Sequence, residues 1–99
     1  MRRVQLTPEA ELDLDEACAW YVDRRPPLGR QFLRAVDTCV TAIRHHPEGY
    51  QLVDRKMRRA LLRRFPYAVF FEVERAGILV YAVFHCARDP RSWKRRRDA

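Results

Sequence analysis

The feature that most limits the fold of this 99-residue chain is a change in the spacing of its apolar residues at Pro47-Glu48-Gly49. Before this turn signal, apolar residues recur every three or four positions, which is typical of amphipathic helices. After it, they alternate with polar residues or run together over short stretches, which is typical of strands. The sequence therefore predicts an α+β fold in which helices come first and a meander of strands follows.

Two helices are predicted before the turn. Thr7 is expected to cap the first helix and Pro8 to occupy its first position, where a missing N–H costs nothing. The two prolines at 26–27 end it, and the second helix stops near His46-Pro47. Each helix has one apolar face: Ala10, Leu14, Ala17, Cys18 and Tyr21 in the first, and Leu28, Phe32, Val36, Cys39, Val40 and Ile43 in the second. A loop this short predicts an antiparallel helical hairpin.

Four strands are predicted around this hairpin. Residues 3–6 alternate weakly, as a short edge strand does, and residues 57–64 mix leucines with arginines, as an exposed or edge strand does. Residues 67–74 show two distinct faces, and residues 78–85 are apolar on both faces, which is typical of a central strand. The predicted order is β-α-α-β-β-β. Residues 87–99 are expected to form a short helix or a frayed tail.

Length and composition bound the class of protein. Ninety-nine residues form a single domain, residues 1–99, and an apolar fraction of 47% excludes a disordered chain. No run reaches the roughly 18 to 20 apolar residues that cross a bilayer, so no membrane partner is expected. The paired arginines at 2–3 are not followed by the apolar stretch of a secretion signal, and the three cysteines form no C-x-x-C pair. These features predict a cytoplasmic protein with reduced thiols.

Positive charge is concentrated in the second half of the chain. Residues 1–51 contain seven Lys and Arg against eight Asp and Glu, whereas residues 52–99 contain thirteen against five. This asymmetry predicts an anionic partner, either nucleic acid or an acidic protein segment. The expected basic surface lies at the rim of the sheet and consists of Arg58, Arg59, Arg63, Arg64, Arg88 and Lys94 to Arg97. Strand alternation would put Arg59 and Arg63 on one face, and Arg58 and Arg64 on the other.

Three further residues have candidate roles. Trp93 has a flat indole that can stack on a base, although packing across the end of the sheet is the favoured role. His85 closes the central strand and can exchange a proton near neutral pH, with Arg88 stabilising a phosphate oxyanion. The alternatives are a histidine hydrogen-bonded to a neighbouring loop and an Arg88 that pairs with Asp89.

Several kinds of site are not expected. The three glycines are isolated, which excludes a nucleotide-binding glycine loop. With one serine and three threonines in the chain, a Ser-His-Asp site is not expected. His45 and His46 are adjacent on a helix, so they cannot share a face as metal ligands do. The sequence therefore predicts neither a metal site nor a cofactor.

The blocks "HHPEGY", "MRRALLRRFPYAVFFEV" and "ILVYAVFHCARDPRSW", which follow a helical hairpin that begins A-x-x-D-L-D-E, resemble the RelE/ParE superfamily of toxins. These toxins belong to bacterial type II toxin–antitoxin pairs, which stabilise plasmids, and the resemblance covers nearly the whole chain. It implies a helical hairpin packed on a twisted antiparallel sheet. It also implies a cognate antitoxin, whose disordered segment folds on the toxin and blocks its working surface.

The superfamily divides by target. ParE-like members bind and poison DNA gyrase, whereas RelE-like members cleave mRNA on the ribosome without a metal. Nuclease members often carry Arg after the strand tyrosine and a Tyr or His near the C-terminus, where this chain has Ala68 and Trp93. We therefore expect a gyrase poison, with the endoribonuclease as the alternative and a basic nucleic-acid binder as the third hypothesis. If the chain is a nuclease, His85, Arg58 and Arg88 would form its site. Whether it is an enzyme stays open.

Overall fold

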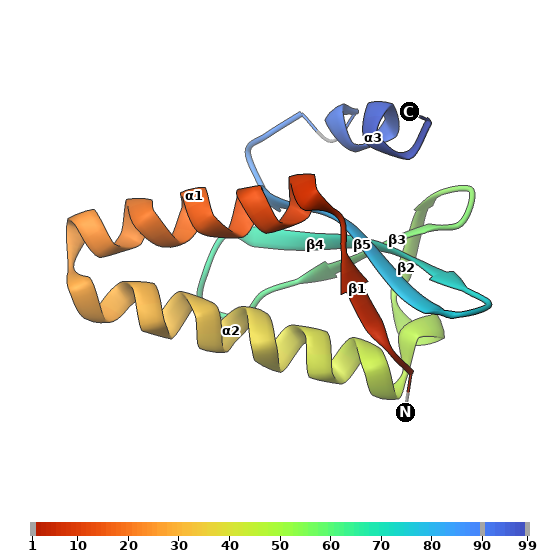
Figure 1. Ribbon diagram of the computed structural model, residues 1–99, viewed down its shortest axis with the longest axis horizontal. Coiled ribbons are helices and arrows are strands. Elements are labelled where there is room, and N and C mark those ends of the chain that lie inside the picture. Colours follow the sequence, from red (N-terminus) through yellow and green to blue (C-terminus); the bar gives the residue numbers. More distant parts are fainter. Residues whose placement is uncertain (1, 90, 99) are drawn as a thin grey trace.

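The computed structural model describes residues 2–89 and 91–98, which form a five-stranded sheet with helices on both faces (Figure 1). The elements in chain order are β1 (Val4–Leu6), α1 (Pro8–Arg24), α2 (Pro26–His45), the 3-10 turn η1 (Pro47–Gly49), β2 (Gln51–Asp54), β3 (Met57–Leu61), β4 (Tyr67–Glu74), β5 (Gly77–His85) and α3 (Ser92–Asp98). The predicted α+β class is confirmed. Met1, Pro90 and Ala99 of the predicted domain lie outside the described residues.

The helices of the hairpin begin and end close to the predicted positions. Thr7 Oγ1 accepts the backbone N–H of Ala10 at 3.1 Å, so this threonine caps α1 as predicted. Arg25 is extended, with φ −157°, because a following proline disfavours the helical conformation, and α2 starts at Pro26. The chain therefore reverses at one residue. None of the helices in the described part of the chain is long and apolar enough to cross a membrane.

The sheet has the strand order β1-β5-β4-β3-β2. Strands β2 to β5 pair antiparallel, and β1 joins β5 in parallel as an edge strand. The prediction that residues 78–85 form a central strand is confirmed, since β5 lies between β1 and β4. Residues 57–64 were predicted to form an exposed or edge strand, and the edge position is wrong. An unpredicted strand, β2, pairs with β3 through Gln51 opposite Arg59 and Leu52 opposite Arg58.

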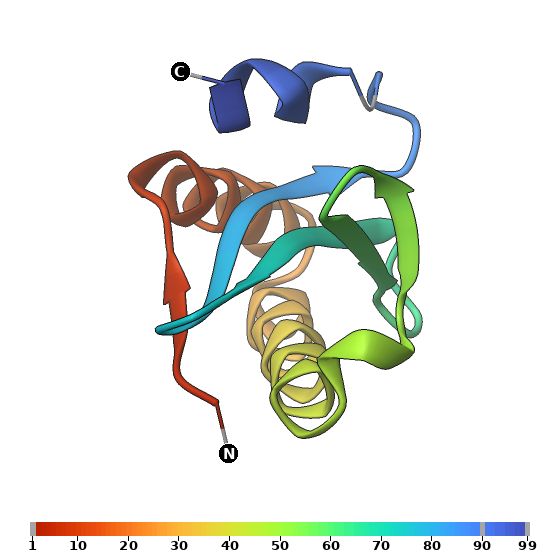
Figure 2. The same cartoon turned by 90° about the vertical axis from the view of Figure 1, so that its right-hand side faces the viewer.

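Apolar side chains form one core on each face of the sheet. The main core lies between the sheet and the hairpin, and it includes Phe32, Ile43 and Phe71. The smaller core lies on the other face, where Met57, Phe70, Ala82 and Phe84 pack against Trp93 of α3. Figure 2 shows the sheet between α2 on one side and α3 on the other. The sheet is therefore covered on both faces, as the apolar character of β5 predicted.

Helix α3 is held by one buried ring and by ion pairs. Trp93 is 3% exposed and stacks on Phe70, with 5.9 Å between ring centroids. Arg96 Nη1 donates to Asp13 Oδ2 at 2.6 Å, and its Nη2 donates to Asp13 Oδ1 at 3.1 Å. Arg96 Nη1 also donates to the Tyr81 carbonyl at 3.1 Å. Trp93 packs against the sheet, as the favoured prediction had it. Residues 92–98 form a helix, so the alternative of a frayed tail does not apply to them.

Candidate functional site

Arg58 has a structural role. Its Nη1 donates to the backbone carbonyls of Tyr50 at 2.7 Å and Glu48 at 3.1 Å, which ties β3 to the turn after α2. In the sheet register Arg58 lies opposite Phe71 of β4, and His85 lies opposite Tyr67 of β4. Arg58 and His85 are therefore four positions apart along β4, which is about 13 Å at the usual rise of a strand. The expected trio of Arg58, His85 and Arg88 is therefore not assembled.

Two of the predicted cations border one small pocket on the α3 side of the sheet, which we call the sheet pocket. It has a volume of about 70 Å³, and Arg59, Leu61, Phe84, His85 and Arg88 are among its lining residues. Arg59 Nη2 donates to Gln51 Oε1 at 2.8 Å. The Arg88 guanidinium carbon lies 3.9 Å from the centre of the Phe84 ring. A cation over an aromatic face keeps its N–H groups free to bind an anion.

His85 is fixed by its own loop. Its Nδ1 accepts the backbone N–H of Ala87 at 3.0 Å, so in the neutral ring Nε2 carries the hydrogen. The predicted alternative, a histidine hydrogen-bonded to a neighbouring loop, is confirmed. The Tyr67 ring meets the imidazole edge-on, with 5.2 Å between centroids. Burial, and to a lesser degree Tyr21, raises the pKa of Tyr67, so this phenol stays neutral near pH 7.

A larger groove, the α1 groove, lies between α1 and the ends of β4 and β5. Its volume is about 560 Å³, and Glu16, Trp20, Tyr67, His85 and Arg88 are among its lining residues. Trp20 is 51% exposed, with the Arg24 guanidinium carbon 4.3 Å from the centre of its ring. Trp20 was not among the residues predicted from the sequence. The available signal was that this tryptophan lies beside the apolar face of α1 and not on it.

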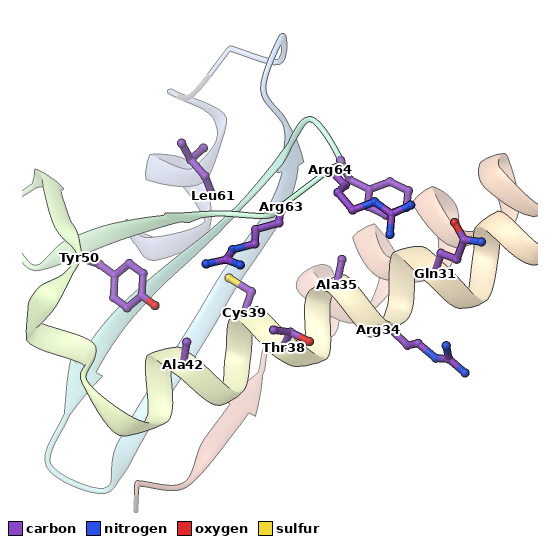
Figure 3. Close-up of a pocket in the computed structure, with 11 residues that line it drawn as sticks. Gln31, Arg34, Ala35, Thr38, Cys39, Ala42, Tyr50, Leu61, Arg63 and Arg64 are labelled. Atoms are coloured by element: carbon purple, nitrogen blue, oxygen red, sulfur yellow. The ribbon is translucent and has the colours of Figure 1, made fainter.

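Another groove, the α2 groove, lies between α2 and the loop that joins β3 to β4 (Figure 3). Its volume is about 530 Å³, and it contains three arginines, Arg34, Arg63 and Arg64. In Figure 3 the Arg63 side chain extends from the loop toward Cys39 on α2, whereas the Leu61 side chain points the other way. Burial raises the pKa of Cys39 to about 11, so this thiol is an inert part of the wall.

Arg34 was not among the predicted candidates, because a basic surface was expected only on the strands and the tail. Helical spacing places Arg34 and Thr38 on one side of α2, next to the face that packs on the sheet, and this spacing was the available signal. The structure therefore places a cation of α2 beside Arg63 and Arg64 in the α2 groove.

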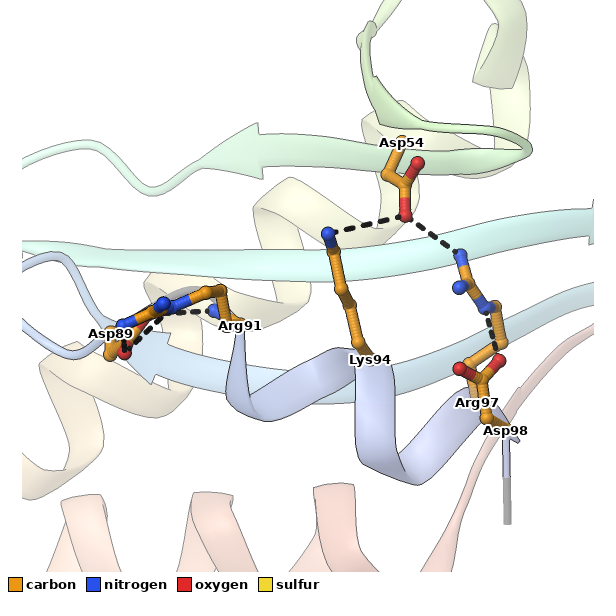
Figure 4. A network of polar contacts seen from close by, with 6 residues as sticks. All are labelled: Asp54, Asp89, Arg91, Lys94, Arg97 and Asp98. Atoms are coloured by element: carbon orange, nitrogen blue, oxygen red, sulfur yellow. Dashed lines mark hydrogen bonds and ion pairs between the residues drawn. The ribbon is translucent and has the colours of Figure 1, made fainter.

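Of the four predicted cations on α3, Lys94, Arg96 and Arg97 are each paired with a carboxylate of the protein body. Lys94 Nζ lies 3.8 Å from Asp54 Oδ2, and Arg97 Nη1 lies 3.3 Å from the same oxygen (Figure 4). Figure 4 also shows that Arg91 forms an ion pair with Asp89. Asp89 was expected to pair with Arg88, and the structure gives it Arg91 instead. Trp93 is buried, and its ring is not available to stack on a base.

The predicted cations Arg59, Arg63, Arg64 and Arg88 do not form one shared basic surface, so that prediction is wrong. Arg59 and Arg88 border the sheet pocket on the α3 side, whereas Arg63 and Arg64 border the α2 groove on the hairpin side. Arg59 and Arg63 therefore do not share a face as predicted. The reason is that β3 ends at Leu61, and Arg64 turns the chain with a left-handed backbone of φ 71°. Within the described residues, no group of three potential His, Cys, Asp or Glu ligands is placed to hold a metal.

Comparison with known proteins gives the family. The sequence profile described as "ParE toxin of type II toxin-antitoxin system, parDE" matches residues 4–90. The chain belongs to the ParE toxin family. The match covers β1, the hairpin and strands β2 to β5, while α3 lies beyond it. The ParE-like branch favoured by the sequence is therefore confirmed as the family.

A solved structure supports the ParE-like fold. A chain described as "Chromosomal ParDE TA system from P. aeruginosa" superposes with a TM-score of 0.76 at 19% identity, covering 86% of this chain and 96% of that one. A search among curated proteins finds no match to the sequence. The arrangement of hairpin and sheet is thus shared with a protein of a toxin–antitoxin system.

Proposed function

We propose that this ParE-family chain inhibits bacterial growth by binding and poisoning DNA gyrase in the cytoplasm, and that a cognate antitoxin neutralises it. The observation that carries the proposal is the family match over residues 4–90, which includes every strand of the sheet and the whole hairpin. The antitoxin would supply a segment that is disordered alone and folds on this chain.

The geometry around Tyr67 supports gyrase over mRNA as the target. The residue after this tyrosine is Ala68, which is buried on the α3 side of the sheet and brings no cation to a scissile phosphate. Loss of one group that stabilises transition-state charge costs about 3 to 4 kcal/mol of barrier. Arg58, the other strand arginine of the predicted nuclease site, is bound to two carbonyls at the other end of the strands.

The sheet pocket is the surface that we assign to the target. Arg59 and Arg88 present two guanidinium groups there, and the neighbouring Leu61 is 62% exposed. An exposed apolar side chain between cations suits an acidic protein surface, because burial of the leucine adds to the charge attraction.

The endoribonuclease stays the alternative, and one observation favours it. His85, Arg59 and Arg88 all line the sheet pocket, so a proton-exchanging group and two cations lie around one small space. The Nε2–H of a histidine in that position could donate a hydrogen bond to a phosphate oxygen while the arginines stabilise its charge.

Two assays on the purified protein separate these functions. We expect inhibition of supercoiling by gyrase, with no cleavage of ribosome-bound mRNA in a primer-extension assay. Cleavage of mRNA that is lost in His85→Ala, together with unaffected gyrase, would establish the nuclease instead. Expression that leaves growth unaffected, with no partner protein present, would favour a basic nucleic-acid binder.

A further inference from the structure

The α2 groove has one wall that permits close approach of another chain. Ala35, Thr38 and Ala42 line the α2 side, and these small residues leave room for a backbone to lie against the helix. Tyr50 and Phe65 add aromatic surface to the lining. A groove of about 530 Å³ with these walls can accept several side chains of a peptide segment in sequence.

The charges of the groove are of one sign. Arg34, Arg63 and Arg64 line it, and no carboxylate is among the lining residues. Within the described part of the chain, none of these three guanidinium groups makes an ion pair or a hydrogen bond. By contrast, Arg96 is paired with Asp13 and Arg97 with Asp54. Three unpaired arginines around an apolar groove favour a partner that carries carboxylates.

The surface on which α3 packs carries carboxylates, whereas the α2 groove carries arginines. Asp13, Asp54 and Glu72 face α3 from the body of the protein, and Asp13 and Glu72 are buried. An acidic segment would place carboxylates against carboxylates there, which is repulsive. Displacement of α3 is therefore a poor route for an acidic partner, and the α2 groove on the other face of the sheet is the better one.

We propose that the α2 groove binds an acidic, partly apolar segment of the antitoxin, and that α3 stays docked in the complex. Carboxylates of the segment pair with Arg34, Arg63 and Arg64, and its apolar side chains cover Ala35 and Ala42. This inference rests on the proposed function, because it names where the proposed antitoxin binds. It separates the antitoxin contact from the sheet pocket, which we assign to the target.

The test is a charge reversal in the groove. We would measure by calorimetry the affinity of the full chain for the protein encoded by the adjacent reading frame, at two salt concentrations. The Arg63→Glu/Arg64→Glu variant should bind at least about tenfold more weakly, and its affinity should depend less on salt. Replacing Arg64 by Glu keeps a Cβ at the left-handed position, so the backbone strain is the same in both proteins.

The matched control is Arg75→Glu, which makes the same change of charge in the turn between β4 and β5, away from the groove. This control should bind the antitoxin within about threefold of the parent, since a rim charge far from a contact acts only through long-range steering. If the double variant does not fold, Arg34→Glu on the surface of α2 tests the same groove with a single change. Circular dichroism and the melting temperature report folding in each case.

The outcomes distinguish the inference from the function on which it rests. Binding by the parent that the groove variants retain would overturn the inference and leave the proposed antitoxin partner intact. Failure of the parent to bind the adjacent protein at all would overturn both. Loss of binding to a single-stranded oligonucleotide in the double variant, with unchanged antitoxin affinity, would assign the groove to nucleic acid and overturn the inference. A large change in Trp93 fluorescence on complex formation, measured in a Trp20→Phe variant, would contradict a docked α3.

Discussion

Replacement of Arg96 by Met should strongly destabilise the fold, because it leaves Asp13 charged and buried. The Asp13 side chain is 7% exposed and that of Arg96 is 18% exposed, and two hydrogen bonds of 2.6 and 3.1 Å join them. Breaking a buried pair by removing one partner costs about 3 to 5 kcal/mol. Arg96 is partly exposed, so we expect a loss near the lower end, about 3 kcal/mol.

Urea unfolding, followed by circular dichroism, measures the loss of unfolding free energy, and a thermal melt of the same variant gives a second measure. For a domain of about this size, each kcal/mol shifts the melting temperature by about 4 to 8 °C, so the variant should melt at least about 12 °C below the parent. The transition should keep its slope with denaturant, which shows that the whole domain still unfolds together. A loss below about 1 kcal/mol would refute the reasoning, because that is the range of exposed ion pairs.

The double variant Asp13→Leu/Arg96→Met is the control for the buried charge. Removing both partners should restore part of the stability, since no charge is then left buried. The recovery should be incomplete, because Asp13 Oδ2 also accepts the backbone N–H of Val83 at 3.0 Å. An unsatisfied buried N–H costs about 1 to 3 kcal/mol, and the double variant should fall short of the parent by that amount.

Three further predictions concern single residues. Arg88→Ala should relieve growth inhibition while its melting temperature stays within a few degrees of the parent's; unfolding of this variant would make Arg88 structural and end its assignment to the target surface. Arg58→Ala should lower the unfolding free energy by about 2 kcal/mol, because its two hydrogen bonds to carbonyls are charge-assisted, and should leave the gyrase inhibition of the folded protein intact. Burial raises the pKa of Glu72 above its ordinary value of 4.5, so the folded state keeps this proton to higher pH than the unfolded chain, and stability is lost as pH rises through that interval. Glu72→Gln should therefore raise the urea midpoint at pH 7 and have little effect at pH 4; an equal effect at both pH values would contradict the role of the charge.

The sequence predicted the hairpin well because its signals are local. Thr7, Pro8 and Pro26 act on the backbone within one or two residues, and the structure places helix ends next to them. The apolar run of β5 was equally informative, since a strand buried on both faces needs no polar side. Strand β2 was missed because its four residues are partly or fully exposed and carry no apolar alternation.

The basic surface was less predictable, because the direction of a side chain after a strand ends depends on tertiary structure. The prediction for Arg59 and Arg63 assumed that side chains alternate between faces along one strand from residue 59 to residue 63. The strand ends at Leu61, so the alternation does not reach Arg63. The pairing of Arg96 with Asp13 joins positions 83 residues apart, and nothing local in the sequence signals it. Local signals and family motifs therefore predicted the fold, whereas the division of the arginines between two faces depends on tertiary structure.

The most direct test of the gyrase proposal is the amount of DNA that gyrase leaves cut. Supercoiled plasmid, gyrase and ATP would be incubated with increasing amounts of the purified protein, and linear DNA would be measured after treatment with detergent and protease. The proposal predicts that linear DNA rises with the amount of the protein and falls when antitoxin is added. No linear DNA at any concentration, with ribosome-bound mRNA cut in a parallel reaction, would contradict it.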